Sequence, residues 1–372
     1  IRLASRNLHH FASLNFVRRF PYGTLSNYVT NYFREFIISV IIIHSIVRRV
    51  SFYVRHQPQV SLRNFSLKMD SIDEYFDGAL ALVKSAGNLI TEHVSGCKVF
   101  EKKSCDIDLV TEIDKKVEET LIGGLSKLWP THKFIGEESV AGGAKCELTD
   151  APTWIIDPVD GTLNFVHGFP HCCISVGLAI NKECVAGIIY NPNLQQLFTA
   201  KKGKGAFLNG RQIHVSQVTE LHNALVAFEV GTSRDEEKCK VVFENYKQIV
   251  SKGHGLRALG SAALNMAMVA MGGADANFEF GIHAWDIAAG DILVREAGGV
   301  CIDPAGGPLD LLSRRVLCAS TPELAQELVK TLYTDYARII RLARLSCACL
   351  AEHVKRSVPG IIQIPMIVVM GS

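Results

Sequence analysis

Asp157 and Asp160 follow a short apolar run in the middle of the 372-residue chain, within the stretch WIIDPVDGTLNF at positions 154–165. The apolar run has the composition of a buried strand, and the proline after Asp157 is expected to end its pairing. Two carboxylates three residues apart at the end of a strand suit an oxygen-preferring cation such as Mg²⁺. Taken alone, the motif is equally compatible with an ordinary turn after a strand.

Gly161 and Thr162 come directly after these aspartates. The glycine supplies the backbone freedom of a tight turn, and the threonine can cap a helical turn. Backbone N–H groups exposed at such a turn suit a phosphate group. Carboxylates and N–H groups so close in sequence therefore predict one site for a cation and a phosphate.

Other acids lie at the ends of expected elements. Glu137 and Glu138 follow a short apolar strand and are expected in a loop, either pointing into the same site or forming a solvated face. Thr111 is expected to cap a helix with Asp114 three residues on. Asp286 falls in the first turn of another expected helix, where an acid is favourable for structural reasons alone.

Hydrophobic periodicity predicts the elements that must position these acids. Asn209-Gly210 predicts a hairpin turn, and Gly203-Lys204-Gly205 is read as another because it lacks the spacing of a phosphate-binding loop. From about residue 215 the pattern changes to alternating strands and helices. Helices are expected at 72–95, 111–127, 236–250, 260–271 and 285–296, and strands at 106–111, 134–139, 154–156, 172–179, 185–190, 197–200, 206–208, 224–230, 256–259 and 274–280.

The net charge of +2 conceals an asymmetry along the chain. Residues 1–68 carry +9 and residues 331–372 carry +3, which leaves −10 on the middle. The acidic middle argues against nucleic-acid binding and is compatible with a site for several cations. The eleven cysteines show no zinc-binding spacing, and we interpret them as reduced thiols of a cytoplasmic protein.

The two ends differ from the middle in composition. Residues 1–68 are basic, almost free of acids and expected to be poorly ordered; they are read as an organelle-targeting (mitochondrial) leader, a signal anchor or sequence foreign to the mature protein. Their apolar run at 36–47 is too short for a confident membrane span. A domain is expected to begin at Met69, with an α+β subdomain at 69–215 that carries the metal site, an α/β subdomain at 216–330 and a divergent tail at 331–372.

Three motifs in this order and separation resemble the inositol monophosphatase family. They are GEES at 136–139, WIIDPVDGTLNF at 154–165, and WDIAAG at 285–290 with EAGG at 296–299, and the resemblance runs from about residue 72 to 330. It implies a layered αβαβα sandwich like that of the fructose bisphosphatases, a homodimer, and Mg²⁺-dependent, lithium-sensitive hydrolysis of inositol monophosphate to inositol and phosphate.

The resemblance also assigns roles to individual residues. It implies that Glu137, Asp157 and the Val159 carbonyl bind a first Mg²⁺, and that Asp157, Asp160 and Asp286 bind a second. Glu137 would help to hold a weaker third ion, with the loop at Lys103–Ser104 closing over the site. Asp114 and Thr162 would orient and deprotonate the attacking water, which the metal activates, and Gly161 and Thr162 would offer N–H groups to the phosphate. The leaving group would be bound by Asp160, Thr232, the Ala262 backbone and Glu279, and His283 would either bind it or only shape the site.

Simple physical chemistry agrees with this assignment. A phosphate monoester is doubly negative, so cations must neutralise it before water can attack, and two metals about 3.5–4 Å apart serve both the attacking and the leaving oxygen. Because recognition of the leaving group rests on few residues, a histidinol-phosphate or sugar-phosphate phosphatase is the alternative enzyme. A silent metal-binding scaffold is the alternative outside enzymes.

Overall fold

The computed structural model describes residues 62–93, 100–103 and 109–333. The chain divides into two compact units, Ile1–Lys68 and Met69–Ser372, and the account below concerns the second unit. The interpretations of the N-terminal segment up to 61 and of the tail after 333 lie outside the described residues. In the part of the chain that is described, no helix is long and apolar enough to cross a membrane.

Most of the expected elements form, and most bounds shift by a few residues, but the first helix begins at Leu62, ten residues before its expected start. The helices are α2 (Leu62–Glu92), α3 (Glu112–Leu128), α4 (Glu137–Ala141), α5 (Thr162–His167), α6 (Glu236–Lys252), α7 (Ala262–Ala270), α8 (Ala284–Glu296) and α9 (Pro322–Thr331). The strands are β1 (Phe100–Lys102), β2 (Leu109–Thr111), β3 (Lys133–Gly136), β4 (Thr153–Asp160), β5 (Cys173–Ile180), β6 (Glu183–Asn191), β7 (Gln196–Lys201), β8 (Gly205–Leu208), β9 (Arg211–Ile213), β10 (Leu225–Phe228), β11 (Gly255–Arg257), β12 (Ala276–Phe280), β13 (Val300–Ile302) and β14 (Arg315–Ala319).

Two sheets form the framework of the unit. The larger has the strand order β3-β4-β5-β6-β7-β8-β9, and only its β3–β4 pair is parallel. The smaller has the order β11-β10-β12-β14-β13, in which β10 pairs in parallel with both of its neighbours. Asn209 and Gly210 both have positive φ angles, 50° and 78°, which confirms the hairpin turn between β8 and β9.

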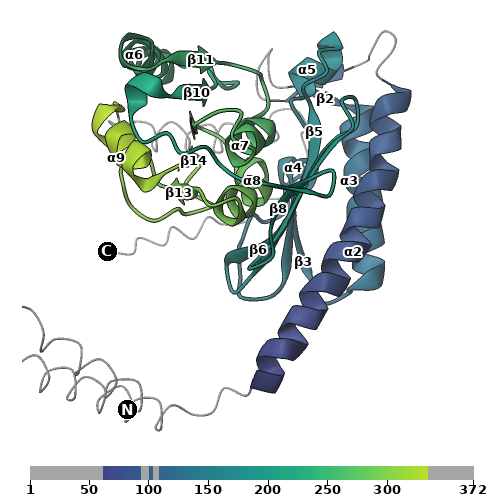
Figure 1. Cartoon of the computed structure of the whole chain (residues 1–372). Coiled ribbons are helices and arrows are strands. Elements are labelled where there is room, and N and C mark those ends of the chain that lie inside the picture. The colour runs from purple at the N-terminus through teal and green to yellow at the C-terminus, as the bar shows by residue number, and fades with distance from the viewer. Residues whose placement is uncertain (1–61, 94–99, 104–108, 334–372) are drawn as a thin grey trace, which may run out of the picture. The chain divides into compact units, whose positions relative to one another are not determined.

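Helices separate and cover the two sheets, as Figure 1 shows. Helices α2 and α3 pack on one face of the larger sheet, α7 and α8 lie between the sheets, and α6 and α9 cover the far face of the smaller sheet. The order of layers is therefore αβαβα, as the resemblance implied. The division into subdomains at residue 215 stays a prediction.

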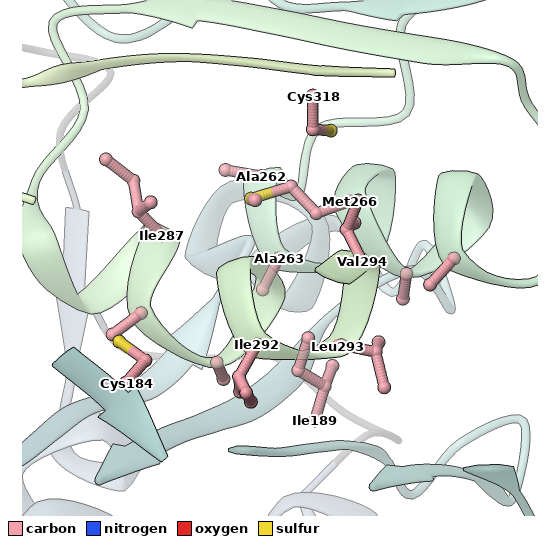
Figure 2. Close-up of a cluster of buried hydrophobic side chains, with 14 of the residues drawn as sticks. Cys184, Ile189, Ala262, Ala263, Met266, Ile287, Ile292, Leu293, Val294 and Cys318 are labelled. Atoms are coloured by element: carbon pink, nitrogen blue, oxygen red, sulfur yellow. The ribbon is translucent and has the colours of Figure 1, made fainter. Parts of the chain in front are cut away.

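The layer between the sheets is the largest apolar core. Figure 2 shows Met266 of α7 and Ile287, Ile292 and Leu293 of α8 packed together, with Ile189 of the larger sheet among them. All five side chains are at most 1% exposed. Burying each contributes about 1.5–3 kcal/mol. Helix α8 is thereby held rigidly, and its first turn carries Asp286 to the edge of the larger sheet.

Two sequence expectations near the acids were wrong in detail. Strand β4 does not end at the proline after Asp157 but runs to Asp160, which pairs with Cys173 after a register shift. A proline can sit at such an irregularity, because the ladder already lacks a hydrogen bond there. Glu137 and Glu138 lie in the first turn of the short helix α4, not in a loop.

Candidate active site

Three carboxylates converge where β4 ends and α8 begins. Asp157, Asp160 and Asp286 each offer an oxygen atom, and these atoms all lie within 4.8 Å of one another. Asp157 is 2% exposed and Asp160 is 7% exposed. We call these three residues the carboxylate cluster. It could hold a metal ion.

The irregularity in β4 explains how two aspartates three residues apart reach the same place. In a regular strand, residues i and i+3 point to opposite faces of the sheet. Here the register with β5 shifts between Asp157 and Asp160, which changes the direction of the second side chain. The Val159 N–H donates to Asp157 Oδ1 at 3.0 Å and fixes the first carboxylate.

The hydrogen bonds that hold Asp160 come from the start of α7. Ser261 Oγ and the Ala263 N–H both donate to Asp160 Oδ2, the latter at 2.8 Å. The Ala262 N–H donates to Oδ1 at 3.3 Å. Ser261 also caps α7, so one serine positions both the helix and the carboxylate. Sequence reasoning missed this role, although a serine before a run of alanines is a recognisable cap.

Asp286 has the structural role that its sequence position allowed, and it is also placed as a candidate ligand. Its Oδ2 accepts the His283 N–H at 2.6 Å and so stabilises the first turn of α8. The same carboxylate belongs to the cluster. The structural role therefore does not compete with the role as a candidate ligand.

Glu137 lies beside the cluster and forms an ion pair with a lysine. Its charge helps to raise the pKa of Asp157, and Lys103 Nζ lies 2.7 Å from its Oε1. Lys103 also contacts Glu138 Oε1 at 2.6 Å. Glu137 is thus within electrostatic reach of the cluster, and the lysine of the expected closing loop is paired with both glutamates. Ser104 lies outside the described residues.

The short helix α4 is anchored by an acid that sequence reasoning overlooked. Glu118 of α3 accepts the N–H groups of Glu138 and Ser139, each at 2.8 Å. These groups lack acceptors within the first turn of a helix. Glu118 lies four residues after Asp114, on the same buried face of α3. Two acids at this spacing among apolar residues were the signal that could have revealed both.

Asp114 and Thr162 form a hydrogen-bonded pair next to the cluster. Thr162 Oγ1 lies 3.1 Å from Asp114 Oδ1 and 2.9 Å from the Val159 carbonyl oxygen, and its single proton serves one acceptor at a time. The Thr111 N–H and hydroxyl hold the other oxygen of Asp114, which confirms the expected capping box. Burial raises the pKa of Asp114 to about 6, with Glu137 adding to the effect. A carboxyl with such a pKa is suited to take up a proton near neutral pH.

Gly161 joins β4 to the helix α5 in a left-handed conformation, with φ 89°. A Cβ atom here would lie 3.0 Å from the carbonyl oxygens of Gly260 and His171, so only glycine fits. Because α5 begins at Thr162, its first N–H groups have no acceptors within the helix. Their binding to a phosphate stays a prediction.

Burial and mutual repulsion both disfavour the charged form of the carboxylates in the cluster. Burial raises the pKa of Asp157 well above its usual range, and Glu137, Asp160 and Asp286 raise it further. Burial, followed by the charges of Asp160 and Glu137, raises the pKa of Asp286 to about 8. Burial raises that of Asp160 to about 6, against the hydrogen bonds from α7. A divalent cation would reverse these shifts, because it stabilises the charged form of every carboxylate near it.

Of the residues expected at the leaving group, Glu279, Thr232 and His283 lie in or after β12 and β10. Asp160 instead ends β4, and Ala262 begins α7. Glu279 of β12 is 4% exposed, and its Oε2 has no hydrogen-bond partner among the described residues. Burial raises its pKa, and nearby Glu229, Asp286 and Asp160 raise it further, so Glu279 lies within electrostatic reach of the cluster. Thr232 is exposed in the loop between β10 and α6.

His283 stacks on Trp285 with the ring centroids 4.5 Å apart. Its side chain is 40% exposed, and its Nδ1 lies 4.0 Å from Asp286 Oδ2. Partial burial and then the charges of Arg314, Lys103 and Lys238 lower its pKa, so the ring is neutral at pH 7. His283 therefore lies beside Asp286 as a neutral ring, and its role at the leaving group stays a prediction.

A layered αβαβα fold with buried carboxylates at a strand end, beside a threonine–aspartate pair, is an arrangement that could serve hydrolysis with metal ions. The model of the inositol monophosphatase family matches residues 71–335, and the chain belongs to this family.

Relatives of known sequence and of known structure agree. The chain is 47% identical to inositol monophosphatase 1 of Homo sapiens over 262 residues, which are 70% of this chain and 95% of the relative. It is 45% identical to inositol monophosphatase 2 of Rattus norvegicus over 268 residues, 72% of this chain and 92% of the relative. The solved inositol monophosphatase from Anabaena (Nostoc) is 30% identical, with a TM-score of 0.62 over 70% of this chain and 96% of the other.

Proposed function

We propose that the chain hydrolyses inositol monophosphate to inositol and phosphate at the carboxylate cluster, with Mg²⁺ as the metal. The observation that carries the proposal is the convergence of Asp157, Asp160 and Asp286 in a chain of this family. All their donor atoms are oxygens, which Mg²⁺ prefers, and neither a cysteine nor a histidine is needed. The donor set therefore fits the ion that the family implies.

The proposed ligands would be shared among two principal ions and a third ion that binds more weakly. Glu137, Asp157 and the Val159 carbonyl would hold the first, and Asp157, Asp160 and Asp286 the second. Lys103, which contacts Glu137, must share this carboxylate with an ion or release it. Bound Mg²⁺ supplies positive charge that neutralises the phosphoryl oxygens.

The residues of the chain then position and move protons. Asp114 Oδ1 accepts the proton of the attacking water, either directly or through the hydroxyl of Thr162, to which it is already hydrogen-bonded. The N–H groups of Gly161 and Thr162 orient the phosphate. Asp160, the Ala262 backbone, Thr232 and Glu279 contact the inositol ring, and His283 borders it.

Phosphate release from inositol 1-phosphate by the full chain tests this proposal. We expect release that rises with Mg²⁺, stops with EDTA and is inhibited by Li⁺. Mg²⁺-independent release, or no release from any monoester, would contradict the proposal. The second outcome would favour a silent metal-binding protein.

The second candidate function is hydrolysis of a broader range of phosphate monoesters. An inositol monophosphatase structure that is 25% identical, with a TM-score of 0.59, holds 2′-AMP. A panel with 2′-AMP, histidinol phosphate and sugar phosphates, ranked by kcat/KM, separates the two. Inositol 1-phosphate is expected to rank first.

We further propose that the chain is a cytoplasmic homodimer. The homodimer is proposed from the family resemblance, because the described structure holds one chain. The cytoplasmic location is proposed from cysteine usage. Light scattering after size-exclusion chromatography tests the dimer. Fractionation of cells that express the full sequence tests the location, and recovery in mitochondria would instead support a leader in residues 1–68.

A further inference from the structure

The loops after β10 and β12 lie side by side at the leaving-group end of the site. The two strands are parallel neighbours, so their carboxyl ends meet at one edge of the smaller sheet, which is a common place for a ligand crevice. Gly231 and Gly281 follow these strands, and both have left-handed φ angles, 71° and 85°. Glu279 lies near the end of β12 in this region, two residues before Gly281.

Lys238 of α6 fills the space that these two glycines leave. A Cβ atom on Gly231 would lie 2.7 Å from Lys238 Nζ, and one on Gly281 would lie 3.1 Å from it. Lys238 is 8% exposed, whereas Lys240 on the same helix is exposed. A side chain at either glycine would therefore displace the ammonium from this position.

This position is unfavourable for a lysine that has only a structural role. Lys238 lies in the first turn of α6, next to the positive end of the helix dipole. Two arginines approach the same loops: Arg234 donates to the Gly231 carbonyl at 2.7 Å, and Arg314 donates to the Gly281 carbonyl at 2.8 Å. Burial lowers the pKa of Lys238, the charge of Glu279 opposes this shift, and the charges of Arg314 and Arg234 add to it. A buried charge under such conditions requires a partner.

Glu279 carries the charge opposite to that of Lys238, and its hydrogen bonding is incomplete. Its Oε2 is buried without a hydrogen-bond partner among the described residues. Lys238 reaches it electrostatically, and also reaches His283. A buried acceptor and a buried ammonium thus lie within electrostatic reach of each other, beside the loops where the leaving group is expected.

We propose that Lys238 and Glu279 together select leaving groups with adjacent hydroxyls. This inference rests on the proposed function and names the basis of substrate choice. The Glu279 carboxylate accepts a hydrogen bond from one hydroxyl, and the Lys238 ammonium donates to the oxygen of its neighbour. Lys238 is then a specificity-determining residue, and an ester whose leaving group lacks hydroxyls does not use it.

Lys238→Met tests the inference, with Lys240→Met as the matched control on the same helix. Both are assayed in the full chain with saturating Mg²⁺, using inositol 1-phosphate and phenyl phosphate. We expect Lys238→Met to raise the KM for inositol 1-phosphate about tenfold while kcat changes less than twofold, and to leave the KM for phenyl phosphate unchanged. Lys238→Arg should restore much of the loss, and Lys240→Met should match the unmodified chain.

Equal kinetics of Lys238→Met and Lys240→Met would overturn the inference, as would equal loss on both substrates. Should Lys238→Met lose the circular dichroism of the folded chain, Lys238→Gln replaces it, and unchanged kinetics of Lys238→Gln would overturn the inference in the same way. Failure of the proposed function has a different signature: the unmodified chain would then release no phosphate from either substrate.

Discussion

The carboxylate cluster and the leaving-group side of the site are built in different ways. In the cluster, Asp157 and Asp160 are three residues apart on one strand, and a register shift in β4 and hydrogen bonds from the start of α7 orient them. On the leaving-group side, Glu279 and Lys238 are 41 positions apart in sequence, and two glycines make room for the lysine. The first region takes two of its three carboxylates from one strand, whereas the second combines side chains of a strand and a separate helix.

This difference predicts which amino-acid substitutions the enzyme tolerates. Every carboxylate of the cluster affects the pKa of another, so the removal of one alters the whole arrangement. On the leaving-group side, each residue would contact a separate part of the substrate. We therefore expect substitutions in the cluster to abolish turnover, and substitutions on the other side to change substrate choice.

Asp157→Asn should have the largest effect. An amide carries no charge with which to hold a cation, and Asp157 is assigned to both principal ions, so kcat/KM should fall about 1,000-fold or more. The fold should be retained, because the change removes a repelled, buried charge. Kinetics with circular dichroism measures both, and Asp150→Asn, at an exposed aspartate, is the control. Normal turnover of Asp157→Asn would refute the metal assignment.

Asp114→Asn should come second, with kcat about 100-fold lower and the KM little changed. The amide can still receive a hydrogen bond from Thr162 but cannot take up a proton. Steady-state kinetics at saturating Mg²⁺ measures the effect, and Glu112→Gln, at an exposed residue of the same helix turn, is the control. A rise in KM at unchanged kcat would assign Asp114 to binding instead.

Glu279→Ala should have a smaller effect, confined to selectivity. It removes one acceptor for a hydroxyl, so kcat/KM for inositol 1-phosphate should fall about tenfold to 100-fold, while that for phenyl phosphate stays within about twofold. The ratio of the two kcat/KM values is the measurement. An unchanged ratio would remove the proposed distinction between the two regions.

The helices and strands were predictable because their signals are local, whereas the layers of the fold and the grouping of the acids came from the family resemblance. Apolar periodicity marked the helices and strands, and Asp286 was correctly placed in the first turn of α8. Strand β4 was cut short because proline normally ends pairing, and the compensating register shift depends on β5. Only the partner strand shows that the chain can pass Pro158 without losing the sheet.

Contacts made at long range were beyond sequence reasoning. Ser261 is 101 residues from Asp160, and Lys103 is 34 residues from Glu137. No spacing or periodicity connects such pairs, since the folding of the sheets alone brings them together. The Lys238 ammonium is a similar case: in the sequence it is one of two alternate lysines on an exposed-looking helix, and only packing distinguishes it from Lys240.

The smallest expected effect is on stability, and it tests whether the cluster is strained without a cation. In EDTA the carboxyls of Asp157, Asp160 and Asp286 have pKa values above that of about 3.9 in an unfolded chain. Between about pH 4 and about 8, these three carboxyls therefore bind more protons in the folded state than in the unfolded state, and their contribution to the free energy of unfolding falls as pH rises through this window. We expect Tm to fall by a few degrees from pH 5.5 to pH 8 in EDTA, and saturating Mg²⁺ to abolish most of this decline. Glu279→Gln separates the two regions: it should leave the rescue by Mg²⁺ intact, whereas Asp286→Asn should weaken it. A Tm in EDTA that rises with pH over this range would contradict the electrostatic account of the cluster.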